Sequence, residues 1–194
     1  CALLEYIPSE MLDLVAIGTI ADMMALTDEN RILVKFGLEI LKNTERVGLE
    51  ALLKVAGIES SDITEETIGF QIAPRLNALG RIDDPNPAIE LLTGWDEDET
   101  RQIAEMIDQK NVERKAIVAE MLLEAESQLD DSPVQFIYQT GWNPGVLGIV
   151  AGQLLQKTGK PIVMLSEENG ILKGSARPIP AFNIFEALTQ HRDL

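Results

Sequence analysis

A change of hydrophobic period near residue 130 constrains the fold of this chain more than any other feature. Between Asp96 and Leu129 apolar residues recur every three or four positions, which predicts one long helix. After the turn-forming run Asp130–Pro133 the apolar residues gather in short runs that predict strands, at 134–138, 161–165 and 171–176. The sequence therefore predicts an α/β fold with a mostly helical N-terminal part, a long connecting helix and then a small β-α-β-β-α domain.

The same patterns divide the chain into three parts. Residues 1–95 are expected to be mostly helical, 96–130 to form the connecting helix, and 131–194 to form the small domain. One helix or two short ones are predicted over 9–26. Further helices are predicted around 32–40, over 48–56, from a possible Asp62/Glu65 capping pair to Pro74, where the chain must bend or restart, over 87–93, over 144–158, and from Ala181 to about His191.

The composition is that of a globular protein with an acidic surface. Hydrophobic residues make up 45% and charged residues 25% of the 194 residues, which is enough for a core. Thirty-two acidic and sixteen basic residues give a net charge of −16, which argues against a general polyanion binder. A local phosphate site remains compatible with this charge, because a few Arg side chains, backbone N–H groups and bound metal can create one.

The few cysteine and histidine residues limit the kinds of catalytic and metal site that are expected, and the chain ends bear on location. The one cysteine, Cys1, can form no internal disulfide, which fits a reducing, cytoplasmic location. We expect no membrane span and no signal peptide, and both ends are expected to be boundaries within a larger protein. The one histidine, His191, has no partner in view for a catalytic triad, so a structural role is expected. The absence of CxxC and HExxH patterns argues against zinc.

The first candidate site residue is Asp22, which follows the apolar run Gly18–Ala21. A carboxylate that is buried without a partner is costly. On the residues alone, two interpretations stay open. Asp22 either caps a helix end or lies partly exposed there, or it is a metal-ligating carboxylate held by a stiff, buried helix.

The second candidate is the run Ile72–Ile82, which carries Arg75, Asn77 and Arg81 and contains no acid. Asn77 and Arg81 are four residues apart, so a helix would place both on one face. Arg suits bidentate phosphate contacts. A structural role and a phosphate role are both compatible with this pattern.

The third candidate is the glycine-rich loop Gly141–Gly148, which follows a predicted strand and opens a helix. A helix N-terminus after a tight loop is a ready anion site, although the loop matches neither the dinucleotide fingerprint nor the P-loop. Trp142 could stack on a base or belong to the core.

The fourth candidate is Lys173–Arg177, at the end of a predicted strand. Side chains alternate along a strand, so Ser175 and Arg177 point the same way and could hold a terminal phosphate. A solvated strand end is the alternative.

Five segments in this order resemble the RecJ family of single-strand-specific exonucleases, within the DHH phosphoesterase superfamily. They cover nearly the whole chain and are Leu12–Asp22, Ala73–Arg81, Asn111–Lys115, Gly141–Ala151 and Gly174–Arg177. The resemblance implies a hydrolase that uses two Mn²⁺ or Mg²⁺ ions to remove nucleotides from the 5′ end of single-stranded DNA in repair and recombination. Single-strand binding protein and a helicase are the protein partners that it suggests.

The resemblance also assigns roles to residues of this chain. Asp22 falls on a metal-ligating, catalytic carboxylate, while Ser175 and Arg177 fall on the segment that binds the 5′ phosphate. The other residues expected to contact phosphate or nucleic acid are Arg75, Arg81, Asn77, Gly174, Trp142, Asn143 and Gly145.

The sequence departs from the family pattern at several points. Asn143 stands where the family usually has His, and Pro178 stands where it usually has Ser. No Asp-His-His or Asp-x-Asp run precedes Asp22. We therefore expect that the two-metal centre does not assemble in this chain and that the chain alone does not hydrolyse DNA.

Two other functions fit the same sequence. One is a phosphodiesterase of the same superfamily that acts on short oligonucleotides or cyclic dinucleotides. The other is a non-catalytic partner-binding module of the same fold, which Asn143, Pro178 and the acidic charge favour.

Overall fold

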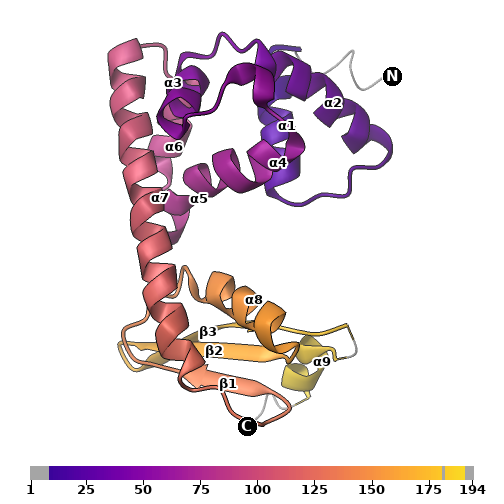
Figure 1. Cartoon of the computed structure of the whole chain (residues 1–194), viewed down its shortest axis with the longest axis vertical. Coiled ribbons are helices and arrows are strands. Elements are labelled where there is room, and N and C mark those ends of the chain that lie inside the picture. Colours follow the sequence, from indigo (N-terminus) through magenta and orange to yellow (C-terminus); the bar gives the residue numbers. More distant parts are fainter. Residues whose placement is uncertain (1–8, 181, 191–194) are drawn as a thin grey trace. The chain divides into compact units, whose positions relative to one another are not determined.

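The computed structural model describes residues 9–180 and 182–190, and the chain divides into two compact units (Figure 1). Unit 1 is Cys1–Val112 and unit 2 is Glu113–Leu194. The division falls within the long helix α7, Glu97–Glu126, so each unit includes part of the helix that the sequence analysis treated as a separate connector. Cys1, Ala181 and His191 lie outside the described residues.

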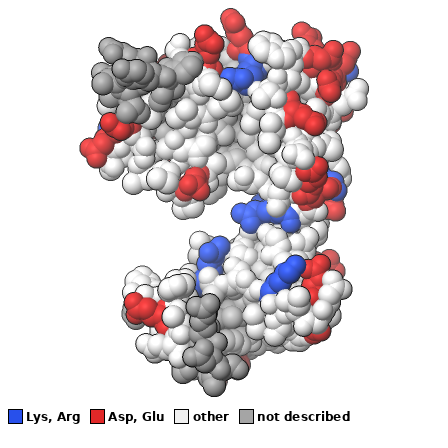
Figure 2. All heavy atoms as spheres, turned by 180° about the vertical axis from the view of Figure 1, so that it is seen from behind, with Lys and Arg blue, Asp and Glu red and all other residues white. Residues whose placement is uncertain are grey.

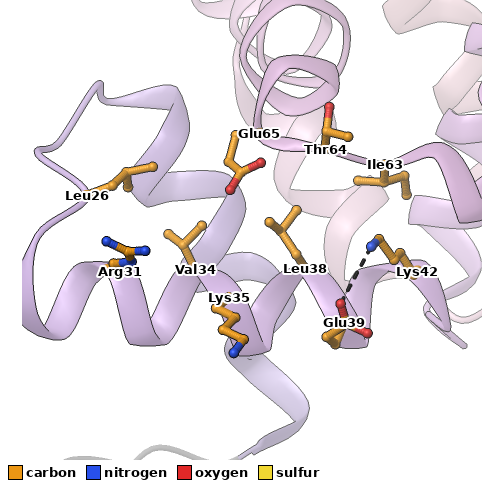
Figure 3. Close-up of a pocket in the computed structure, with 10 residues that line it drawn as sticks. All are labelled: Leu26, Arg31, Val34, Lys35, Leu38, Glu39, Lys42, Ile63, Thr64 and Glu65. Carbon is orange, nitrogen blue, oxygen red and sulfur yellow. Dashed lines mark ion pairs between the residues drawn. The ribbon is translucent and has the colours of Figure 1, made fainter.

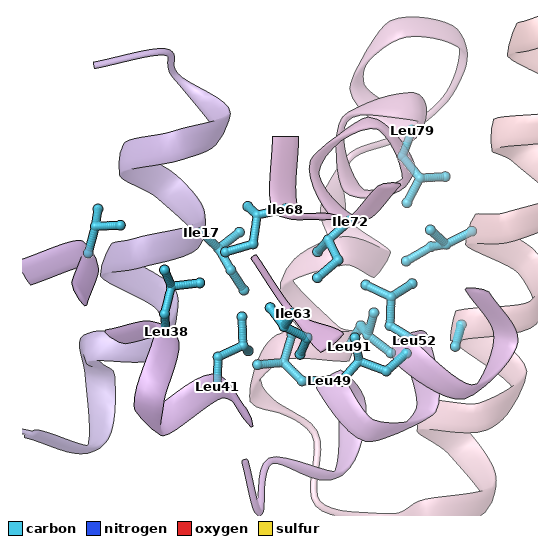
Figure 4. Packing of buried hydrophobic residues seen from close by; sticks show 14 residues of the cluster. Ile17, Leu38, Leu41, Leu49, Leu52, Ile63, Ile68, Ile72, Leu79 and Leu91 are labelled. Carbon is cyan, nitrogen blue, oxygen red and sulfur yellow. The ribbon is translucent and has the colours of Figure 1, made fainter. Parts of the chain in front are cut away.

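Unit 1 is built from helices only in its described part. In chain order these are η2 (Ser9–Met11), α1 (Leu12–Ala21), α2 (Asp28–Lys42), α3 (Val47–Ala56), η3 (Ser60–Asp62), α4 (Glu65–Thr67), η4 (Ile68–Ile72), α5 (Ala73–Ile82), α6 (Asn86–Thr93) and the first part of α7. Their apolar faces meet in one cluster that includes Leu41, Leu52, Ile68 and Leu91 (Figure 4).

Two helix boundaries in unit 1 differ from the sequence prediction. The helix expected over 9–26 ends at Ala21, because Met23 takes a left-handed backbone (φ 54°) that an α-helix cannot continue through. The predicted capping pair Asp62/Glu65 is wrong, because Thr64 caps α4 and forms a reciprocal capping box with Thr67.

Helices α1 and α2 approach each other closely. A Cβ atom added at Gly37 of α2 would collide with the backbone oxygen of Leu12 in α1. Glycine therefore allows α2 to pack on α1, and α1 also packs against η4 and α5. These contacts fix the direction in which α1 ends.

One ion pair joins three separate segments of unit 1. Asp13 of α1 has a side chain only 3% exposed. Arg46, at the start of α3, donates to both of its oxygens, Nε to Oδ2 at 2.9 Å and Nη2 to Oδ1 at 3.3 Å. The same guanidinium donates to the carbonyl oxygens of Glu10 and Leu92. A buried carboxylate is tolerated when it is paired in this way.

Unit 2 has the β-α-β-β-α order that the sequence predicts. After the second part of α7 come β1 (Gln135–Tyr138), α8 (Leu147–Thr158), β2 (Ile162–Glu168), β3 (Ile171–Arg177) and α9 (Ile184–Thr189). The sheet has the order β1-β2-β3, with β1 parallel and β3 antiparallel to β2. Helix α8 packs against β2 and β3 (Figure 1).

The β2–β3 hairpin turns at Asn169–Gly170, and both residues have positive φ. An Asn-Gly pair suits this tight turn because its backbone twist matches that of the strands. The resulting register pairs Met164 with Ser175 and Ile162 with Arg177. No helix in the described part of the chain is both long and apolar enough to cross a membrane.

We predict that Arg46→Ala lowers the free energy of unfolding by about 3–5 kcal/mol, because it leaves the buried carboxylate of Asp13 unpaired. Urea unfolding followed by circular dichroism measures the change. The matched control is Arg101→Ala, which removes an exposed pair with Asp98 and should cost less than about 1 kcal/mol. Equal losses in the two variants would contradict a special role for Arg46.

Candidate functional site

Asp22 lies directly after the last residue of α1, and its side chain is exposed. Its backbone N–H donates to the Gly18 carbonyl at 3.0 Å, and the N–H of Met23 donates to the Ile20 carbonyl at 3.0 Å, so the helix ends here. Its carboxylate makes no hydrogen bond or ion pair with any residue that the structure describes. A carboxylate at this position faces the negative end of the helix dipole, an arrangement that a bound cation would relieve.

Asp22 is therefore not held inside a buried helix. It lies exposed at the end of α1, as the first of the two interpretations expects. The buried acid of α1 is Asp13, which is committed to Arg46. Within residues 9–180 and 182–190, no group of three or more His, Cys, Asp or Glu side chains is arranged to hold a metal ion. One hard oxygen ligand suits Mg²⁺ or Mn²⁺ in kind but does not complete their coordination. The role of Asp22 as a ligand stays a prediction.

Helix α5 carries the second group of candidates. Asn77 and Arg81 are both exposed and lie one turn apart, as the four-residue spacing predicts. Arg75 is largely buried, and its guanidinium is already bound within unit 1. Its Nε donates to Asp108 Oδ1 at 2.8 Å, and its Nη1 donates to the Gln71 carbonyl at 2.8 Å. Of the two arginines, Arg81 is thus the more accessible to a phosphate.

The end of α5 is fixed to α7 by a further ion pair. Lys110 Nζ lies 2.8 Å from Asp83 Oδ2. The hydrogen bond from Lys110, together with one from the backbone N–H of Asp84, holds the pKa of Asp83 below its usual value. Asp83 and Asp84 also accept hydrogen bonds from the backbone N–H groups of Asp84 and Asn86, which shapes the turn after α5.

Trp142 belongs to the core of unit 2. Its side chain is buried, and its indole Nε1 donates to Glu124 Oε2 at 2.6 Å. Gln139 donates to the same oxygen at 3.1 Å, and Ser166 donates to the Trp142 carbonyl at 2.8 Å. Of the two roles that the sequence left open for Trp142, the structure favours the core, since a buried ring with a satisfied N–H offers no face for stacking.

Asn143 and Gly145 shape the loop that leads into α8. The Oδ1 atom of Asn143 accepts a hydrogen bond from the backbone N–H of Gly145 at 2.9 Å, which forms an Asx turn. A pocket of about 350 Å³ lies beside this loop and is lined by Ile117, Glu120, Met121, Glu124, Gln139, Thr140, Gly141, Trp142 and Asn143. Its two carboxylates make it a poor phosphate site.

Ser175 and Arg177 come together with the first turn of α8. Both belong to alternate positions of β3 on one side of the sheet. Arg177 Nε donates to the Gly148 carbonyl at 3.2 Å. A Cβ atom added at Gly148 would lie 3.0 Å from both Ser175 Oγ and Arg177 Nη2. We call Gly148, Ser175 and Arg177 the β3–α8 cluster.

The β3–α8 cluster has the electrostatics of an anion site. Arg177 is exposed, and Ser175 is half-buried beside it. The first turn of α8 holds no acid, and the start of a helix carries the positive end of its dipole, although the N–H groups of Ile149 and Val150 already donate to the Val146 carbonyl. A guanidinium, a hydroxyl and the positive end of a helix dipole therefore meet in one place.

Two glycines near this cluster have different roles. Gly148 was not singled out from the sequence, although its place in the first turn of a helix that packs on a sheet was an available signal. Gly174 was predicted to contact nucleic acid. A Cβ atom there would lie 2.6 Å from Leu165 Cδ2 and 2.7 Å from the Met164 oxygen, so tight strand packing already explains this glycine.

Charged side chains are spread unevenly over the surface. Figure 2 shows one face, on which Asp and Glu side chains form several patches between wide uncharged areas and Lys and Arg side chains form a few smaller patches. A second pocket, of about 340 Å³, lies in unit 1 between α2 and the start of α4 (Figure 3). This pocket combines apolar residues with charged groups that include the Lys42–Glu39 ion pair. None of the site residues predicted from the sequence lines it.

Comparison with known proteins identifies the family. Residues 131–193 match the DHHA1 domain. The single-stranded-DNA-specific exonuclease RecJ of Bacillus subtilis is 48% identical over 199 residues, which cover 100% of this chain and 25% of that protein. The chain belongs to the RecJ family. Crystal structures of Thermus thermophilus RecJ in complex with Mg²⁺ and with Mn²⁺ both match with a TM-score of 0.88 and 32% identity, over 96% of this chain and 29% or 28% of theirs.

The chain thus spans 25% to 33% of the length of the curated RecJ proteins that it matches. The DHHA1 match contains the whole β3–α8 cluster, whereas Asp22 and α5 lie before it. The likeness to RecJ extends beyond the DHHA1 domain, because the matched region covers nearly the entire chain, including unit 1.

We predict that Gly148→Ala and Gly152→Ala have different effects on stability, although both replace a glycine in α8. Alanine in a helix interior normally adds about 0.5–1 kcal/mol. Gly152 has no neighbour near its Cβ position, so it should show this gain, whereas at Gly148 the methyl group must displace Ser175 or Arg177. Urea unfolding of both variants tests this. An equal gain would mean that the β3–α8 cluster is looser than described.

Proposed function

We propose that this chain is part of a metal-dependent 5′→3′ exonuclease for single-stranded DNA, and that the β3–α8 cluster binds the 5′-terminal phosphate. The observation that carries the proposal is the convergence of Ser175, Arg177 and the first turn of α8. The substrate class is supported by the names of the matched relatives, which are single-stranded-DNA-specific exonucleases.

The chemistry of the cluster suits a terminal phosphate. The planar guanidinium of Arg177 can donate two parallel hydrogen bonds to phosphate oxygens. Ser175 can donate one more from its hydroxyl, and backbone N–H groups of α8 add others. A terminal phosphate carries more charge and more acceptor oxygens than an internal phosphodiester, so this set of donors selects a strand end. Held at one end, the strand presents its next phosphodiester bond for hydrolysis.

Asp22 is proposed to ligate one of two Mn²⁺ or Mg²⁺ ions. The matched RecJ structures are described as complexes with these ions. Such ions activate water and stabilise the leaving oxygen. Asp22 would contribute a hard carboxylate oxygen from a position that makes no competing ion pair within the described residues.

The two departures from the family pattern affect the loop and the strand end. Asn143 cannot carry a proton as His can, and its Oδ1 is used within the loop by Gly145. Pro178 follows the last residue of β3, where a missing N–H removes no bond of the β2–β3 ladder. We propose that neither substitution removes the phosphate-binding role of Ser175 and Arg177.

Three further proposals rest on the family alone. They are roles in DNA repair and recombination, contacts with single-strand binding protein or a helicase, and a cytoplasmic location. The names of the relatives favour DNA exonuclease action over hydrolysis of short oligonucleotides or cyclic dinucleotides. A non-catalytic role of the same fold would leave Asp22 without a metal to bind.

We predict that Arg177→Ala weakens binding of a 5′-phosphorylated single strand by about tenfold or more and leaves a 5′-hydroxyl strand nearly unchanged, since it removes charged hydrogen bonds to the terminal phosphate. Fluorescence anisotropy at several salt concentrations measures both affinities. Lys173→Ala is the matched control, because Lys173 lies on the same strand, is exposed and pairs with Glu168. Equal losses for both strands would remove Arg177 from the terminal-phosphate role.

We also predict that the purified chain alone does not release nucleotides from a 5′-labelled strand in the presence of Mn²⁺. The physical reason is that one proposed ligand, Asp22, cannot hold two ions. Gel analysis over several hours measures release, with Asp22→Ala as the control for contaminating nuclease. Cleavage that disappears in the Asp22→Ala variant would show that this prediction is wrong.

A further inference from the structure

We propose that Phe70 stacks on a base of the bound single strand, within an exposed surface formed by Phe70, Asn77 and Arg81. We call this surface the η4–α5 face. The inference rests on the proposed function, because it supplies a base contact for the same strand. It adds an aromatic residue of unit 1 to a set of candidates that otherwise contact phosphate.

The fold does not account for the position of the Phe70 ring. Its neighbours Ile68 and Ile72 are 0% and 1% exposed and point into the core of unit 1 together with Leu79 (Figure 4). Phe70 lies between them and is 81% exposed. Burial of a phenyl ring is strongly favourable, so this ring gains from any ligand that covers it. It also lies on a π-helical turn, a feature that is frequent at functional sites.

Phe70, Asn77 and Arg81 share one face of a continuous helical run. Seven residues, or about two turns, separate Phe70 from Asn77, and four residues separate Asn77 from Arg81. All three are exposed, whereas the opposite side of the run carries the buried residues Ile72, Ala78 and Leu79. An aromatic ring, an amide and a guanidinium are therefore presented together.

The charge of this run is opposite to that of the chain. Residues 67–82 contain two arginines and no Asp or Glu, in a protein of net charge −16. The run itself contributes no carboxylate, Arg75 is paired with Asp108 of α7, and Arg81 is the exposed positive charge that this face presents. An exposed aromatic beside polar and cationic groups is the combination that binds single-stranded nucleic acid by stacking and charge.

Phe70 has polar neighbours along its own helical run. It is flanked by the exposed Gln71 and, about two and three turns further on, by the exposed Asn77 and Arg81. Met23 and Met24, which follow α1, are exposed as well. A base that covers the ring would also have an amide and a guanidinium along the same helical run.

The η4–α5 face also borders the candidate metal ligand. Helix α1 packs against η4, and the Cβ position of Gly69 lies 3.8 Å from Ile20 Cγ2. Ile20 comes two residues before Asp22. A base that stacks on Phe70 would therefore bind on the element that packs beside the end of α1.

The test compares two oligonucleotides of equal length and charge, one ordinary and one in which abasic tetrahydrofuran sites replace all bases. Phe70→Ala should weaken binding of the ordinary strand by about tenfold or more and leave the abasic strand unchanged in fluorescence anisotropy. Phe70→Trp should restore binding, and Phe70→Leu should not. Trp95→Ala is the control, because Trp95 is 91% exposed in the same unit but precedes four acidic residues.

Each result decides the matter. Phe70→Ala with wild-type affinity for the ordinary strand, equal losses on both strands, or rescue by Leu would overturn base stacking. If the wild-type chain meanwhile still prefers a 5′-phosphorylated strand, the proposed function stands and only the Phe70 inference fails. If the wild-type chain binds neither strand, both fail. Urea unfolding checks that the variants fold, as an exposed position predicts.

Discussion

The ion pair between Arg46 and Asp13 is the interaction on which unit 1 depends. A carboxylate with a 3% exposed side chain is tolerated only because one guanidinium contacts both of its oxygens. The remaining N–H groups of Arg46 bond to carbonyls at Glu10 and Leu92, so three chain segments are joined at one point. This ion pair holds α1 in place. The position of α1 in turn sets where its exposed end at Asp22 lies and how η4 and α5 pack beside it.

Unit 2 depends on strand register and on small residues. The antiparallel pairing of β2 with β3 places Ser175 and Arg177 on one side of the sheet. The missing side chain of Gly148 lets both approach the first turn of α8. Glu124 of α7 meanwhile accepts hydrogen bonds from Trp142 and Gln139, which fixes the loop that leads into that helix. The proposed anion site thus depends on backbone geometry as much as on charge.

The proposed binding of single-stranded DNA requires an acidic protein to contact a polyanion. The net charge of −16 is spread over the surface, yet residues 67–82 lack acids and the first turn of α8 has none. Local donors decide phosphate binding because charges in water are screened beyond about 10 Å at moderate salt. The acidic remainder disfavours nonspecific binding of nucleic acid, which is compatible with the proposed selection of a strand end.

The sequence by itself determined the features that depend on local periodicity. It predicted the order of helices and strands, the shared side of Ser175 and Arg177, and the shared face of Asn77 and Arg81, because these follow from repeats of two and of about 3.6 residues. Only the tertiary structure decided that Asp13 is buried and Asp22 exposed, that Arg75 binds Asp108, and that Trp142 is held by Glu124. These contacts join residues 18 to 33 positions apart, and no local period encodes them.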